Sequence, residues 1–187
     1  DKMKLLESSK KLFDICYKIL CPSKFVYEFV YKTYPNEKLI HTDWLDYDLS
    51  NLKYNLKINK HYKINIGVLV TLNECKGEEQ VKYLEKNNLH PDVNFYIVKK
   101  YNIFRRYKDN YKSFIKIVKD YNIHGLLYLN KWGETWCYSL SKGLASGLPI
   151  LYNNIGAFKE RIPKNYNKYI INNNDELEYY DFKMLTN

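Results

Sequence analysis

An acidic residue just ahead of a helix rich in small residues offers the clearest chemistry in this chain. It is Glu134, within the stretch GLLYLNKWGETWCYSLSKGLASGLPILYNNIGAFKER at 125–161. A buried strand is predicted to end at Asn130, and a short loop leads from it into a helix predicted over 137–146. Such a loop presents a helix N-terminus at the carboxyl edge of a sheet, where free N–H groups and the helix dipole attract a phosphate or diphosphate. Because many α/β domains bind anions in this way, the pattern alone does not identify the ligand.

This segment resembles the donor-binding core of glycosyltransferase family 4, whose members are retaining enzymes with the two-domain GT-B fold. The family pattern reads approximately E-x7-E, then A-x-G-x-P, then G-G/A-x-x-E. Glu134 stands at the first glutamate, Ala145-Ser146-Gly147-Leu148-Pro149 matches the second element, and Gly156-Ala157-Phe158-Lys159-Glu160 matches the third. The version with Trp132 and Glu134-Thr135 is most similar to a bacterial-type branch written WPETYSYTLSEALA.

The resemblance extends outward from this core, over most of 18–175. The run CPSKFV at 21–26 resembles the entry at the end of the first domain, and 41–43 falls where the family often carries a His-Gly-Val-Asp-like turn. The run from Gly67 to Gly77 resembles the first strand and loop of the donor domain. The resemblance implies that the chain is part of a longer enzyme.

Roles for individual residues follow from the resemblance. Lys76 would meet the donor diphosphate and offset charge on the leaving group, and Glu134 would lie by the transferred sugar and its phosphate. The donor is also expected to contact Gly156, Glu160 and the start of the helix, where backbone N–H groups face the phosphates: Thr135, Trp136, Cys137 and Tyr138. Without the resemblance, each residue has a plainer interpretation. Lys76 would be a solvated lysine, Glu134 a helix cap, and Glu160 an exposed acid in a turn.

Two positions depart from the family pattern. Lys142 stands where the family has its second glutamate, which accepts hydrogen bonds from the ribose hydroxyls, and a lysine cannot accept a hydrogen bond. Three interpretations stay open: ribose is held differently, Lys142 reaches a phosphate, or donor binding has been lost. Thr71 stands where relatives often place an arginine five residues before the lysine, although the most similar branch often lacks it too.

The function expected from these residues is transfer of a sugar from a nucleoside-diphosphate sugar to an unknown acceptor, which could be a glycan, a protein or a lipid. Retention of configuration is implied by the family alone, and neither a metal nor a further cofactor is expected. The chain by itself is expected to transfer little, because the acceptor would lie across the cleft on an N-terminal domain. The alternative is a non-catalytic glycosyltransferase-like domain kept for binding or assembly. Another GT-B enzyme, such as an epimerase or a phosphorylase, is a third candidate.

The elements that must position these residues alternate between strands and helices. Strands are predicted at 64–70, 93–98, 125–129, 149–152 and 168–171, with helices at 78–87, 109–121 and 137–146, and a last helix at 176–185 capped by Asp175. This order predicts an α/β fold with a Rossmann-like parallel sheet and helices on both faces, corresponding to the C-terminal half of a GT-B fold.

The domain organisation is predicted from a change near Lys63, where a polar, irregular stretch gives way to alternating strands and helices. Residues 1–60 are read as the end of an N-terminal domain and its linker, 61–175 as the nucleotide-sugar-binding domain, and 176–187 as a C-terminal helix. Before the linker at 43–62, helices are predicted at 3–17 and 24–33, the second capped by Ser23, with short strands at 18–21 and 38–42.

Composition limits the other classes of function. The formal net charge is +9, but the lysines are scattered, and abundant Lys, Asn, Ile and 20 Tyr indicate an AT-rich genome, such as that of a large DNA virus or a protist. No nucleic-acid partner is expected, while peripheral contact with a membrane stays open. The four cysteines and four histidines show no metal-ligand spacing, which favours a reducing compartment and a cytoplasmic location. These residues are Cys16, Cys21, Cys75, Cys137, His41, His61, His90 and His124.

Overall fold

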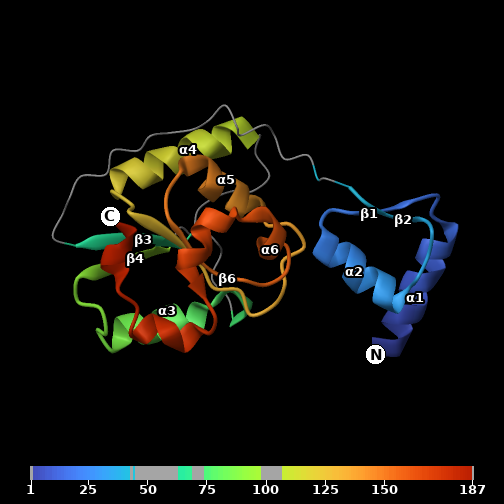
Figure 1. The fold of residues 1–187 in the computed structure, drawn as a ribbon, viewed down its shortest axis with the longest axis horizontal. Coiled ribbons are helices and arrows are strands. Elements are labelled where there is room, and N and C mark those ends of the chain that lie inside the picture. The colour runs from blue at the N-terminus through green and yellow to red at the C-terminus, as the bar shows by residue number, and fades with distance from the viewer. Residues whose placement is uncertain (1, 43, 45–62, 69–73, 98–106, 187) are drawn as a thin grey trace.

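The computed structural model describes residues 2–42, 44, 63–68, 74–97 and 107–186. They form a five-stranded sheet unit and a smaller N-terminal unit with its own two-stranded sheet (Figure 1). The α/β class with a parallel, Rossmann-like sheet is therefore confirmed. Thr71 and the predicted linker, apart from Trp44, lie outside the described residues.

Every pair of neighbouring strands in the main sheet runs parallel, in the order β4-β3-β5-β6-β7. The strands are β3 (Ile64–Val68), β4 (Val93–Ile97), β5 (Gly125–Tyr128), β6 (Ile150–Asn153) and β7 (Ile170–Ile171). β5 and β6 are buried along their whole length, because helices cover both faces of a parallel sheet. The chain order reverses between β3 and β5, which makes this the switch point of the sheet.

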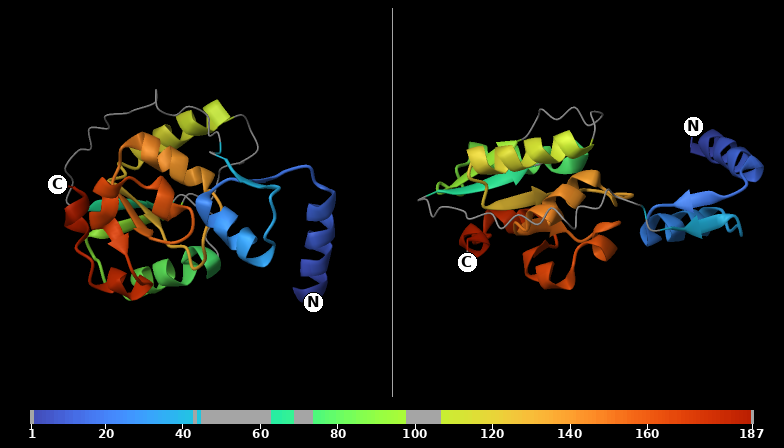
Figure 2. Two further views of the ribbon diagram at one scale, coloured as in Figure 1. Left: turned by 45° about the vertical axis from the view of Figure 1, so that its right-hand side comes forward. Right: turned by 90° about the horizontal axis from the view of Figure 1, so that it is seen from above.

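Helices cover the two faces of this sheet (Figure 2). α4 (Tyr107–Asp120) and α5 (Tyr138–Ser146) lie together on one face, and α3 (Glu78–Lys86) lies on the other. A Cβ at Gly143 would stand 2.9 Å from the Tyr128 hydroxyl oxygen and 3.0 Å from Leu126 Cδ1, so the glycine lets α5 pack close to β5. Gly147 ends α5 in the left-handed conformation, with φ of 73°.

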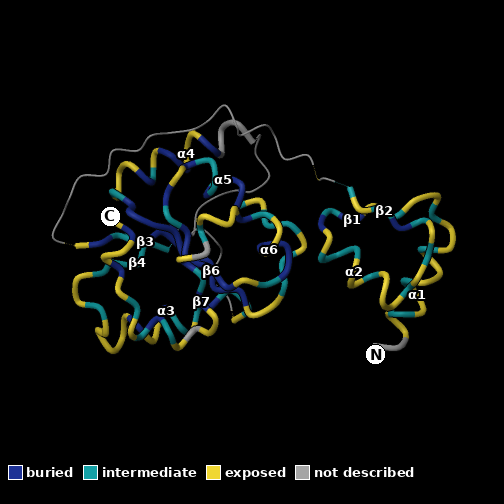
Figure 3. Tube along the Cα trace, viewed as in Figure 1, coloured by how far each residue is buried: buried dark blue, intermediate teal, exposed yellow. Residues whose placement is uncertain are grey.

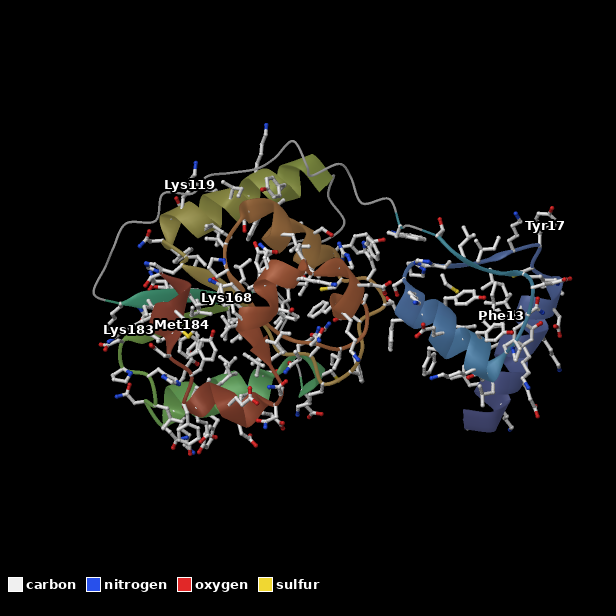
Figure 4. The ribbon with its side chains drawn as sticks, viewed as in Figure 1. Phe13, Tyr17, Lys119, Lys168, Lys183 and Met184 are labelled. Atoms are coloured by element: carbon white, nitrogen blue, oxygen red, sulfur yellow. The ribbon has the colours of Figure 1, made fainter. Side chains whose placement is uncertain are left out.

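The N-terminal unit consists of α1 (Lys2–Ile15), β1 (Ile19–Cys21), α2 (Lys24–Thr33) and β2 (Leu39–His41). β1 pairs parallel with β2, and the Ser23 side chain caps α2 by accepting from the Val26 N–H, as predicted. Phe13 and Tyr17 lie in this unit, well away from the main sheet (Figure 4). No residue of α2 is buried, so the unit packs far less tightly than the sheet unit.

The core follows the middle strands of the five-stranded sheet, where Figure 3 shows the longest buried runs. It includes Leu177, Phe182 and Leu185 from the C-terminal segment. The predicted helix at 176–185 is wrong, because that segment forms two short 3-10 helices, η4 (Asn174–Glu178) and η5 (Phe182–Leu185). The predicted Asp175 cap is also wrong, since Asn173 accepts from the N–H groups of Asp175 and Glu176. Two short helices separated by a turn let Leu177 and Phe182 both reach the core.

Among the described residues, no helix is long and apolar enough to cross a membrane. The lysines labelled in Figure 4, Lys119, Lys168 and Lys183, come from α4, η3 (Lys164–Tyr169) and η5 respectively. These three cations are therefore spread over different elements.

Candidate functional site

Two charged residues far apart in sequence meet at the carboxyl edge of the sheet. Lys76 ends η2 (Glu74–Lys76), which follows β3, and Glu134 lies in the loop after β5. β3 and β5 flank the switch point, where ligands of open parallel sheets bind. Their side chains form an ion pair, with 19% and 17% of the respective side-chain surfaces exposed. The sequence predicted both residues for the site, and the fold brings them together.

Backbone contacts hold the η2 turn against the end of β5. The Lys131 N–H donates to the Cys75 carbonyl oxygen at 2.9 Å. Gly77 adopts φ of 74°, and a Cβ there would stand 2.3 Å from the Leu129 Cβ. Only glycine fits so close an approach at a positive φ, and this fixes Lys76 beside the Glu134 loop.

The Lys76 ammonium is half-buried, and this affects its protonation. Burial lowers the pKa of Lys76 from its ordinary value, while the nearby Cys137 and Cys75 thiols act in the opposite direction. A cation with reduced hydration interacts strongly with any anion that reaches it. Lys76 is therefore suited to compensate negative charge at this edge.

The loop after Glu134 leads directly into α5. The helix begins at Tyr138, one residue later than predicted, and Cys137 precedes it in the left-handed conformation with φ of 69°. No side chain caps this N-terminus, although the Cys137 sulfur lies 3.3 Å from the Ser139 hydroxyl oxygen. The N–H groups of the first turn, together with the helix dipole, can therefore receive an anion at the same edge as Lys76.

Arg161 organises this loop, a role that no sequence pattern indicated among the chain's 30 Lys and Arg residues. Its guanidinium donates to the carbonyl oxygens of Trp136 and Cys137, and at 2.6 Å to the Ser141 hydroxyl oxygen. It also stacks over the Trp136 ring, 3.8 Å from the ring centre. Because the arginine takes up the loop carbonyls, it fixes the orientation of the peptide groups that lead into α5.

The second glycine turn lies against the Glu134 backbone. Gly156 has φ of 59°, and a Cβ there would stand 2.5 Å from the Glu134 nitrogen. The Ala157 N–H donates to the Glu134 carbonyl oxygen at 3.0 Å. The sequence predicted this turn near the site, and its backbone supports the loop that carries Glu134.

Glu160 contacts the N-terminal unit, and Tyr138 contacts Trp44, which follows that unit in the chain. The Glu160 carboxylate accepts from the Lys24 N–H at 2.9 Å and from the Phe25 N–H at 3.2 Å, at the start of α2. The Trp44 indole N–H donates to the Tyr138 hydroxyl at 2.6 Å. The role expected of Glu160 at the donor stays a prediction.

The remaining predicted residues occupy less defined positions. Thr135 is exposed beside Glu134. Lys142 lies one turn inside α5, where burial lowers its pKa. This position of α5 therefore carries an ammonium and not a carboxylate.

Comparisons with models of known protein families and with curated proteins gave no match to this chain. Among the described residues, no group of three or more His, Cys, Asp or Glu side chains could hold a metal ion.

Proposed function

We propose that this chain is the donor-binding half of a retaining glycosyltransferase with a GT-B fold, which transfers a sugar from a nucleoside-diphosphate sugar. The observation that carries the proposal is the Lys76–Glu134 ion pair at the switch point, next to the N-terminus of α5. Three features that favour a diphosphate therefore converge: a half-buried cation, a helix N-terminus and a glycine-supported loop. The resemblance over 124–161 points to Glu134 and the start of α5, and the resemblance over 67–77 points to Lys76, both independently of the fold.

In this proposal the diphosphate lies between Lys76 and the first turn of α5. Lys76 exchanges its contact with Glu134 for the phosphate oxygens, and so stabilises the charge that develops on the departing nucleoside diphosphate. Glu134, released from the lysine, faces the sugar. Arg161 keeps the loop in the shape that presents its N–H groups.

A non-catalytic binding or assembly domain is the second candidate, and Lys142 is the observation that favours it. A half-buried ammonium on α5 replaces the carboxylate that relatives use for ribose. In that case the fold and the ion pair persist but nucleotide affinity has declined.

Calorimetric titration with UDP, GDP, UDP-glucose and GDP-mannose separates the two candidates. The native chain and a Lys142→Glu variant are measured side by side. Binding by the native chain that is lost in a Lys76→Met/Glu134→Gln variant supports the transferase, and the preferred base names the donor class. Binding that emerges only in Lys142→Glu supports the non-catalytic domain. Absence of binding in both contradicts the proposed site.

A further inference from the structure

Asn130 is a buried amide without a hydrogen-bond partner among the described residues. It follows β5 at the carboxyl edge and is 3% exposed. Neither its Oδ1 nor its Nδ2 atom is hydrogen-bonded. Because burying an unpaired amide destabilises a folded chain, the position calls for an explanation.

The alternation of side chains along β5 indicates which way Asn130 faces. Leu126 and Tyr128 lie against Gly143 of α5, whereas Leu129 lies against Gly77 on the opposite face. Successive side chains of an extended segment point to opposite faces. Because Leu129 continues this alternation past the end of β5, we infer that Asn130, the next residue, faces the side of α5.

The segments flanking Asn130 are those that hold the proposed site. Its neighbour Lys131 is hydrogen-bonded to Cys75 in the η2 turn, and the Glu134 loop begins directly after. The Lys76–Glu134 ion pair joins these two segments. When a diphosphate binds Lys76 in place of Glu134, the ion pair that joins these two segments is broken. The sugar attached to the diphosphate can then reach the buried amide.

We propose that the Asn130 amide binds a pair of hydroxyl groups on the transferred sugar, an inference that rests on the proposed function. An amide offers both a donor and an acceptor, and adjacent sugar hydroxyls offer both in return. A phosphate offers only acceptors, so it would pair with Nδ2 and leave Oδ1 unpaired. Asn130 thus contributes to the choice of sugar, while Lys76 and α5 hold the diphosphate.

The test compares each nucleoside diphosphate with its sugar conjugate, UDP with UDP-glucose and GDP with GDP-mannose, in the native chain and in Asn130→Leu. We expect the variant to melt at a higher temperature, because leucine removes the unpaired amide and keeps the same branched arrangement of four side-chain atoms. We also expect it to bind the sugar nucleotide about tenfold more weakly, while binding of the diphosphate changes by less than about twofold. A purely structural asparagine would give a lower melting temperature, which would overturn the inference.

The matched control is Asn65→Leu, at the opposite edge of the sheet. Asn65 donates to the Tyr121 carbonyl at 2.7 Å and accepts from the Asn94 amide at 2.9 Å. Leucine there should therefore lower the melting temperature and leave unchanged the difference in affinity between the sugar nucleotide and the diphosphate. If Asn130→Leu weakens the binding of UDP and UDP-glucose equally, or leaves the difference in affinity between them unchanged, the role of Asn130 is refuted while the proposed function stands. Failure of the native chain to bind any of the four compounds would refute the proposed function, and this inference with it.

Discussion

Two asparagines at opposite edges of the five-stranded sheet, Asn65 and Asn130, differ in their hydrogen bonding. At the amino edge, the Asn65 amide donates to Tyr121 and Asn122 and accepts from Asn94. At the carboxyl edge, both amide atoms of Asn130 lack partners among the described residues. The same residue type is thus fully bonded at one edge and unpaired at the other.

The other charged and polar groups also differ between the two edges. The amino edge is closed by its own chain, where the Asn65 N–H donates to His124 Nδ1 at 2.9 Å and the His124 N–H returns to the Asn65 carbonyl at 2.8 Å. The carboxyl edge brings together the Lys76–Glu134 pair and the uncapped start of α5. This difference fits the proposal that the amino edge serves stability and the carboxyl edge receives a ligand, as open parallel sheets generally do.

The largest effect is expected from Arg161→Ala, which removes the support of the carboxyl-edge loop. Three hydrogen bonds and the stacking contact with Trp136 are lost, so we expect the free energy of unfolding to fall by about 3 kcal/mol. Denaturant unfolding measures this change. Arg161→Lys is the control, and full recovery of stability by lysine would contradict the role of the guanidinium fork.

Lys76→Met should weaken UDP or GDP binding by roughly 30-fold, about 2 kcal/mol, because a half-buried cation no longer meets the diphosphate. Leaving Glu134 unpaired could disturb the fold, so the double variant Lys76→Met/Glu134→Gln is titrated in parallel. If both variants bind UDP and GDP with native-like affinity, the carboxyl edge is not part of the binding site.

Asn65→Leu sharpens the comparison from the other side. Since the amide bonds of the amino edge are lost, we expect the free energy of unfolding to fall by about 1.5 kcal/mol. Nucleotide affinity should stay within about twofold of the native value. A stable variant with impaired nucleotide binding would reverse the roles assigned to the two edges.

The smallest effect is expected from Glu160→Gln. The amide keeps one accepting oxygen, replaces the other with an NH2 donor and loses the charge, so exchange of the Lys24 and Phe25 amide hydrogens should become at least about threefold faster. Hydrogen exchange followed by NMR reads these two amides directly. Unchanged exchange with a large loss of UDP affinity would assign the carboxylate to the donor instead.

The sequence predicted the sheet well because its signals are local. Buried apolar runs marked the strands, and Ser23 marked the start of α2. The C-terminal segment was predicted wrongly as one helix, because its apolar spacing does not reveal that Leu177 and Phe182 reach the core from two separate 3-10 turns.

The site was only partly predictable, for a physical reason. Lys76 and Glu134 could be selected by resemblance, and the fold pairs them. The contact between Glu160 and α2 joins groups 136 residues apart, and Arg161 acts on carbonyl groups, which carry no side-chain signature. The unpaired amide of Asn130 becomes visible only when every partner around it is placed.

The most direct test of the account is to map UDP and GDP binding residue by residue, using backbone amide NMR on the native chain. We predict that the largest shifts fall at Lys76, Gly77 and the start of α5, around Tyr138 and Ser139, while Asn65, Asn94 and His124 stay unchanged. Shifts centred on the amino edge, or none at either edge, would contradict the claim that the carboxyl edge holds a nucleoside diphosphate.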